Sequence, residues 1–247
     1  MDGLPRSFPN PGHCYDLAIV GAGVSGCELS YLAARSGLDV LLVTQSLDSL
    51  GVLFSSVVDI PFPEGTLFEK IRKRVLEKSA VPDMWGFHRA LKQELESTSG
   101  IHLLQSMVTG LGETDDAVDI QTWEGIPRRA KKAVIAVGSF LGSELHIGRS
   151  VQSAGRLSEV SYDDLYRYFL GQGCVFEDRE DGVLAESGSL DYRVTYRVFS
   201  ASEVDAFRLK RFDHTYALGR CLPGSSSYSQ VLEQAHSVWC VLSGVRL

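Results

Sequence analysis

A glycine-rich turn near the N-terminus places the strongest constraint on how this chain folds. Residues 21–26 read Gly-Ala-Gly-Val-Ser-Gly, which is the spacing Gly-x-Gly-x-x-Gly. The turn follows an apolar run at 15–20, opens a helical pattern at 24–36, and precedes a second apolar run at 38–43. In a β-α-β unit of this kind, backbone N–H groups and the positive end of the helix face a pyrophosphate. The sequence therefore predicts a dinucleotide-binding turn.

Each glycine of the turn has its own physical reason. Gly21 permits the tight turn, Gly23 lets the backbone approach the phosphates, and Gly26 lets the helix pack on the strand. The predicted cofactor contacts here are Gly21, Ala22, Gly23, Val24, Ser25 and Gly26. A glycine-rich turn without a ligand is the alternative interpretation, and the strand-turn-helix context argues against it.

Patterning along the rest of the chain predicts an α/β fold, a Rossmann-type domain with a parallel central sheet. Helical patterns cover 66–78, 84–97, 161–170 and 228–242, and strand patterns cover 101–104, 117–123, 133–137, 192–199 and 214–218. We expect 101–104 and 117–123 to belong to a β-meander, and about 171–212 to form a small antiparallel insertion. A length of 247 residues suits one domain. We expect it to span 15–247, after a flexible leader at 1–14.

The end of the second strand departs from the usual dinucleotide pattern. Asp or Glu commonly ends this strand and accepts hydrogen bonds from a ribose. Here the strand ends in Thr44-Gln45-Ser46, whose hydroxyl and amide groups can make such bonds without a charge. Asp48 can substitute only if its loop folds back. The adjoining loop at 51–64 is long and without clear periodicity, which makes a functional role a fair hypothesis.

Composition excludes several classes of partner. The formal net charge of −7 opposes electrostatic binding to the phosphate backbone of a nucleic acid. The basic clusters at 70–74 and 128–132 are typical of a solvated helix face and a hairpin edge. The five cysteines form no Cys-x-x-Cys pair, so no metal site is predicted. No apolar run approaches the length of a membrane span, and the N-terminus lacks the parts of a signal peptide. We expect a cytoplasmic protein that binds neither membrane nor metal.

Three blocks of sequence resemble the glucose-inhibited division protein A family, GidA or MnmG. The first is residues 15–51, the second is 133–148, and the third and weakest runs from Ala217-Leu218-Gly219-Arg220 to Tyr228 and Gln234. Members of that family are FAD enzymes that modify the wobble uridine of tRNA. Their second strand also ends in threonine, a polar residue and an Asp-x-Leu-Gly turn, so the resemblance accounts for the missing carboxylate.

The resemblance implies FAD as the cofactor and extends the predicted site beyond the glycine turn. The added cofactor contacts are Thr44, Gln45, Ser46, Gly51, Val108, Gly138, Ser139, Phe140, Gly219, Arg220 and Tyr228. Arg220 is expected to meet phosphate or the carbonyl edge of the flavin, with a surface salt bridge as the alternative. NAD stays open as a third interpretation, because the glycine turn alone does not distinguish the two dinucleotides.

The chain also departs from the family. The catalytic Cys-Asn-Pro loop of the family corresponds here to Val52-Leu53-Phe54-Ser55-Ser56-Val57-Val58-Asp59-Ile60-Pro61, which has no cysteine. A short segment replaces the family's inserted domain, and the chain stops at Leu247 before the helical tRNA-binding region. We therefore expect a short GidA-related protein that does not modify tRNA alone.

Two functions remain compatible with these patterns. The first is an FAD-dependent oxidoreductase with an unidentified substrate and electron donor, NADH and NADPH being the candidates. The second is a non-catalytic FAD-binding module or a subunit of a larger complex, and a protein partner or a homo-oligomer stays open. No catalytic side chain is assigned, since the flavin carries the electron transfer. Cys221 and His146 are weighed as candidates, with a buried inert thiol and a local hydrogen-bonding histidine favoured.

Overall fold

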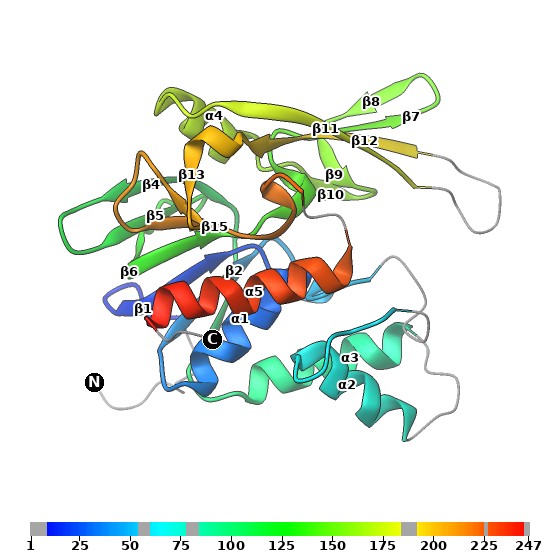
Figure 1. Ribbon diagram of the computed structural model, residues 1–247. Helices are drawn as coiled ribbons and strands as arrows, with labels where there is room; N and C mark the ends of the chain where they lie inside the picture. Colours follow the sequence, from blue (N-terminus) through cyan, green and yellow to red (C-terminus); the bar gives the residue numbers. More distant parts are fainter. Residues whose placement is uncertain (1–8, 54–59, 78–83, 184–191, 225–226, 245–247) are drawn as a thin grey trace.

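A parallel sheet lies at the centre of the molecule (Figure 1). The computed structural model describes residues 9–53, 60–77, 84–183, 192–224 and 227–244. Five strands run parallel in the order β15-β6-β1-β2-β3. Their bounds are β1 Cys14–Val20, β2 Val40–Thr44, β3 Ile101–Gln105, β6 Arg128–Ile135 and β15 Thr215–Ala217. The prediction of an α/β fold with a parallel central sheet is confirmed.

The buried strand β1 divides the apolar core into two halves. Leu17 and Ile19 face a cluster that contains helix residues, whereas Ala18 and Val20 face a cluster on the opposite side of the sheet. This alternation is the pleat of a strand buried on both faces. The first half is covered by α1 Val24–Arg35, α2 Leu67–Leu76, α3 Met84–Ser97 and α5 Tyr228–Ser243. Figure 1 shows α5 lying along α1, so the last described helix packs against the first.

A β-meander covers the other face, and its composition differs from the prediction. It consists of β4 Val108–Glu113, β5 Val118–Thr122 and β6, which pair antiparallel in sequence. The apolar run at 101–104 is instead β3, which pairs parallel with β2 at the edge of the central sheet. Short apolar runs look alike in both settings, so periodicity alone did not assign this one. Helix α4 Asp163–Gly171 packs on β4.

A separate antiparallel sheet lies at the end of the molecule opposite α2 and α3 (Figure 1). Its order is β11-β12-β7-β8, with bounds β7 Glu144–Ile147, β8 Ser150–Gln152, β11 Phe176–Val183 and β12 Tyr192–Phe199. We expected this antiparallel part to begin at about residue 171, whereas its first strand, β7, begins at Glu144. The last strands of the expected 171–212 insertion are β13 Val204–Asp205 and β14 Arg208–Leu209. They do not join the separate sheet: β14 pairs with β15 at the edge of the central sheet, and β13 pairs with β14.

Short elements complete the region where the parallel strands end. A hairpin of β9 Ala154–Arg156 and β10 Glu159–Val160 lies between β8 and α4. Single turns of 3₁₀ helix are η1 Leu47–Ser49, η2 Gly138–Phe140, η3 Ala201–Glu203 and η4 Gly219–Cys221. Within the described part of the chain, no helix has the length and apolar character needed to cross a membrane, and no group of three or more side chains suited to a metal ion occurs.

Candidate cofactor site

The glycine turn between β1 and α1 is shaped by close backbone contacts. Gly21 has a φ of +104°, and a Cβ there would lie 2.5 Å from the carbonyl oxygen of Ala136. A Cβ on Gly26 would lie 2.0 Å from the carbonyl oxygen of Gly21. A Cβ added to Gly23, by contrast, would have no neighbouring heavy atom within 4 Å. Two glycines therefore close the turn against the protein, and the third leaves the space above it open.

The N-terminus of α1 is an open electropositive end. Gly23 is its N-cap, no side chain caps the helix, and the first turn carries no acidic residue. The first N–H groups of a helix lack partners within the helix and carry partial positive charge. An anion placed over this turn would receive both the hydrogen bonds and the field.

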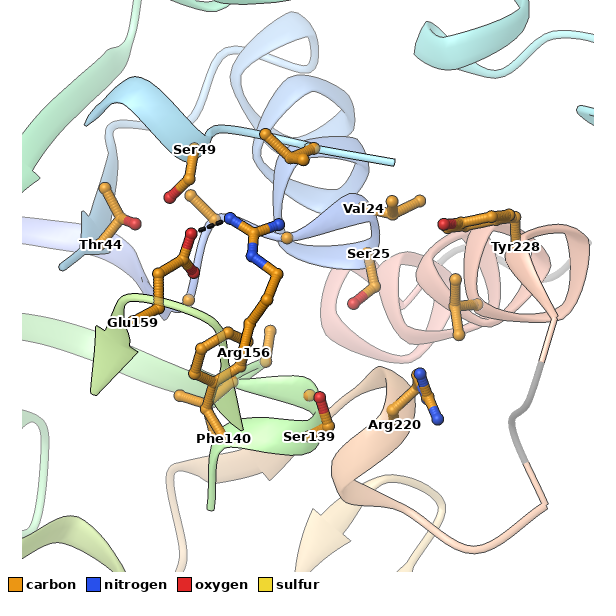
Figure 2. Close-up of a pocket in the computed structure, with 18 of the residues that line it drawn as sticks. Val24, Ser25, Thr44, Ser49, Ser139, Phe140, Arg156, Glu159, Arg220 and Tyr228 are labelled. Carbon is orange, nitrogen blue, oxygen red and sulfur yellow. Dashed lines mark ion pairs between the residues drawn. The ribbon is translucent and has the colours of Figure 1, made fainter. Parts of the chain in front are cut away.

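A cavity of about 540 Å³ lies over the turn, at the carboxyl ends of β1, β2 and β6. Figure 2 shows its lining side chains drawn from α1, η2, the β9–β10 hairpin and α5. Twelve of the predicted residues line it: Gly21, Ala22, Gly23, Val24, Ser25, Thr44, Gln45, Gly138, Ser139, Phe140, Arg220 and Tyr228. Residues far apart in the sequence therefore meet at one place.

A second cavity of about 550 Å³ adjoins the first beyond the end of β2. The two share Gln45, Ser49, Val52, Arg156 and Glu159 in their linings. The remaining walls are largely apolar and include Met84, Trp85, Met107, Trp123 and Leu157. The two cavities therefore lie next to each other, the first over the glycine turn and the second past the end of β2.

Five predicted residues do not line the first cavity. Ser46 and Gly51 line the second cavity. Gly26 is buried in the contact of α1 with the turn, and Gly219, at a φ of +76°, would bring a Cβ to 2.5 Å from Ser25 Oγ. These two glycines allow close packing around the cavity. Val108 lines neither cavity and lies fully buried in the core on the meander side, so its prediction as a contact has no support in the position of its side chain.

Several lining residues escaped the sequence analysis. Arg156 and Glu159 form an ion pair on the β9–β10 hairpin, and Tyr162 follows that hairpin. No local pattern marks this segment, because only the fold brings it over the end of β2. The start of α5 did carry a usable signal: Ser227 and Gln230 form a capping box, and Ser227, Ser229 and Tyr228 all line the cavity.

Arg220 is held at one end of the first cavity by the antiparallel sheet. Its guanidinium donates to the hydroxyl of Tyr196 at 3.0 Å and forms an ion pair with Asp181. Burial lowers the pKa of Arg220, although a guanidinium stays charged throughout the physiological range. The Arg220 Nε atom is buried without a partner among the described residues. A fixed cation with a spare donor therefore borders the cavity.

The candidate thiol, Cys221, and the candidate histidine, His146, do not line this cavity. The Cys221 thiol is fully buried and donates to the carbonyl oxygens of Leu218 and Ile135 at 3.0 and 3.1 Å. Burial raises its pKa to about 11, so it is a neutral thiol at physiological pH. His146 lies on β7, 3.4 Å from the hydroxyl of Thr195. The structure favours the inert interpretation of Cys221 and a local role for His146.

The site has features that fit an adenine dinucleotide. The uncapped N-terminus of α1 and the open space at Gly23 suit a pyrophosphate. The two adjoining cavities and the cation at Arg220 suit the groups on either side of a pyrophosphate. A site of this kind on a parallel sheet with an added meander defines a Rossmann-type dinucleotide-binding protein.

Comparison with known proteins identifies the family. The profile of the glucose inhibited division protein A family matches residues 16–212. The chain belongs to this family, and its cofactor is FAD. The chain is 28% identical over 209 residues to the tRNA uridine 5-carboxymethylaminomethyl modification enzyme MnmG of Chlamydia felis. The aligned region covers 73% of this chain and 34% of that protein. The chain thus spans about a third of the length of the curated relatives it matches.

Two solved structures are similar to this chain, one over almost its whole length and one over part of its length. The GidA-related protein from Thermus thermophilus is 38% identical, has a TM-score of 0.83, and is matched over 94% of this chain and 99% of its own. Aquifex aeolicus GidA has a TM-score of 0.77 at 14% identity, over 94% of this chain and 64% of its own, which shows a shared fold. The predicted resemblance to a short GidA-related protein is confirmed.

Proposed function

We propose that this FAD-binding protein is an FAD-dependent oxidoreductase that exchanges electrons with an external donor and an external acceptor. The observation that carries the proposal is one cavity shared by the N-terminus of α1 and by Arg220 and Tyr228 near the start of α5. FAD bound along it would have its pyrophosphate at the helix end and its isoalloxazine beside Arg220. NADH and NADPH are the proposed donors.

In this proposal, the protein supplies binding and electrostatics, and bound FAD supplies the electron transfer. Arg220 would stabilise negative charge at the pyrimidine edge of the flavin, and Tyr196 and Asp181 would hold its guanidinium in place. Among the described residues that line the first cavity there is neither a cysteine nor a histidine. A thiol step within the first cavity therefore has no described group to perform it.

We further propose that nucleic acid is not a partner of this chain alone. The net charge of −7 supports this, as does a loop at 52–61 without the cysteine found in the family's Cys-Asn-Pro loop. Residues 54–59 of that loop lie outside the described part of the chain. All five cysteines are free, which agrees with the proposed cytoplasmic location.

A non-catalytic FAD-binding module is the second candidate function. The first cavity has few groups suited to proton transfer, which favours this candidate. Glu159 is the one carboxylate among the described residues that line it, and Glu159 is paired with Arg156. A protein that only stores or presents FAD needs no such group. The two candidates differ in whether the flavin turns over.

The deciding experiment is anaerobic mixing of the purified yellow protein with NADH or NADPH while the flavin absorption is recorded. An oxidoreductase is expected to lose its visible flavin band and to regain it when an acceptor such as oxygen or a quinone is added. Gly23→Val protein with added free FAD controls for reduction off the protein. A flavin that dithionite reduces reversibly but that neither nucleotide reduces would contradict the oxidoreductase proposal with these donors and favour the module.

A further inference from the structure

The ribose-binding carboxylate that β2 lacks must be sought elsewhere in the fold. The Thr44 hydroxyl at the end of β2 donates to the Ser46 carbonyl oxygen at 3.2 Å and accepts from the Ser46 N–H at 3.4 Å. Local bonds therefore occupy it. Asp48, the nearest acid in sequence, has a side chain 94% exposed and paired with Lys92. Asp48 is absent from the lining of the first cavity and lines only the second.

Glu159 lies where that carboxylate would be needed. It is the only acidic side chain among the described residues that line the first cavity, and it also lines the second. Gln45 and Ser49, from the end of β2 and from η1, share both linings with it. Figure 2 shows its carboxylate directed to the side of the cavity where Thr44 and Ser49 lie. Its side chain is only 17% exposed.

The segment that carries Glu159 is fixed to a neighbouring element. Tyr162 is buried and lines the first cavity together with Gln45, the residue that follows β2. The Tyr162 N–H donates to the carbonyl oxygen of Phe140 at 2.7 Å. Gly155 packs so closely on the Phe140 ring that an added Cβ would lie 2.3 Å from it. The position of Glu159 is thus set by packing.

The positive charge of Arg156 offsets the repulsion between the Glu159 carboxylate and a phosphate bound nearby. Its guanidinium pairs with Glu159 and lines the same cavity as the glycine turn. Figure 2 shows Arg156 reaching across the cavity to the Glu159 carboxylate. Without this cation, a buried negative charge would be repelled by a pyrophosphate on the turn.

We propose that Glu159 accepts the hydrogen bonds of the ribose hydroxyls in the adenosine half of FAD, and that Arg156 is its positioning residue. The hairpin from a distant part of the sequence thereby takes the role that a strand-end Asp or Glu has in other dinucleotide folds. The inference rests on FAD as the cofactor and is independent of whether the flavin turns over.

The test measures ribose recognition directly, with the full chain freed of flavin. ADP and 2′,3′-dideoxy-ADP compete with FAD, whose fluorescence reports binding. The wild-type protein is expected to bind ADP about 10- to 100-fold more tightly than the dideoxy analogue, as befits hydrogen bonds to a charged acceptor. In Glu159→Ala, the ADP affinity should fall by this factor while that for the dideoxy analogue stays, so that the ratio approaches one.

Control variants separate recognition from folding. Asp48→Ala, which removes the rival carboxylate, should leave the ratio unchanged. Glu159→Gln keeps a neutral acceptor and a partner for Arg156, so it should fold and give an intermediate ratio. Arg156→Lys should reduce the ratio because the acceptor is less well fixed.

The outcomes are distinguishable. A folded Glu159→Ala or Glu159→Gln protein that retains the full wild-type ratio would overturn the inference, and so would a ratio lost in Asp48→Ala. Wild-type protein that binds neither FAD nor ADP would overturn the cofactor itself, and with it the proposed function.

Discussion

The carboxylate of Glu28, on α1, accepts the backbone N–H of Leu67, the first residue of α2, through both oxygens at 3.1 and 2.9 Å. Glu28 is fully buried, and His236 Nε2 of α5 lies 3.0 Å from one of its oxygens. A negative charge at a helix N-terminus satisfies a free N–H and is favoured by the helix dipole. One side chain thus joins three helices behind the cofactor site.

Removal of this carboxylate should weaken the fold. In Glu28→Ala, the Leu67 N–H is left buried without its acceptor, and we expect the free energy of unfolding to fall by about 1.5–3 kcal/mol. Urea unfolding followed by circular dichroism measures it. Glu96→Ala, at an exposed position on α3, is the control and should change it by less than about 0.5 kcal/mol. Equal losses in the two variants would refute a specific role for Glu28.

The glycines of the turn should separate binding from folding. Ala at position 23 meets no protein atom within 4 Å and suits its φ of −73°. Gly23→Ala should keep its stability yet bind FAD at least about tenfold more weakly, because the methyl group enters the cavity. Gly26→Ala should cost about 1–3 kcal/mol of stability, because its Cβ meets the Gly21 carbonyl. Thermal unfolding and FAD titration check both, and a stable Gly26→Ala protein would contradict the packing argument.

Arg220 should set the reduction potential of the bound flavin. Arg220→Gln removes a cation that would favour the anionic reduced flavin, and we expect the two-electron potential to become about 30–60 mV more negative. Spectroelectrochemical titration measures this. Arg167→Gln, which removes an exposed arginine of α4, is the matched control. An unchanged potential in Arg220→Gln would show that the flavin lies away from this side chain.

The buried thiols and phenols should make the protein sensitive to alkali. Burial raises the pKa of Cys221 and of Cys174 from 9.0 to about 11, and that of Tyr168 from 10.0 to about 12. The folded state therefore holds protons that the unfolded state releases first, so stability falls as pH rises from about 9 towards 11. Urea midpoints between pH 7 and pH 10.5 report this fall. A midpoint that rises over this interval would be inconsistent with buried neutral groups.

Thiol reactivity gives an independent check of the same burial. Cys14 is exposed and Cys240 is partly exposed, whereas Cys27, Cys174 and Cys221 are buried. In the folded protein at pH 8, a disulfide reagent should modify the first two rapidly and the other three only after unfolding. Rapid labelling of Cys221 would reopen a redox role for it.

The sequence alone predicted the elements whose signals are local. The Gly21 to Gly26 turn, the helix after it and the buried strand before it follow from short-range sterics and periodicity, which a single segment carries. The capping box at Ser227 is a local signal of the same kind. The run at 101–104 was assigned to the wrong layer, because an apolar segment does not encode which strand it will pair with.

Tertiary structure alone decided which further groups, beyond the predicted ones, border the cavity. The sequence determined that a dinucleotide turn exists and that β2 ends without a carboxylate at Thr44. Only the folded chain brought Arg156 and Glu159 to that same strand end and placed the Cys221 thiol in the core. The physical reason is that hydrogen bonds and steric contacts between neighbours in sequence shape a turn, whereas burial and charge pairing depend on packing between remote segments.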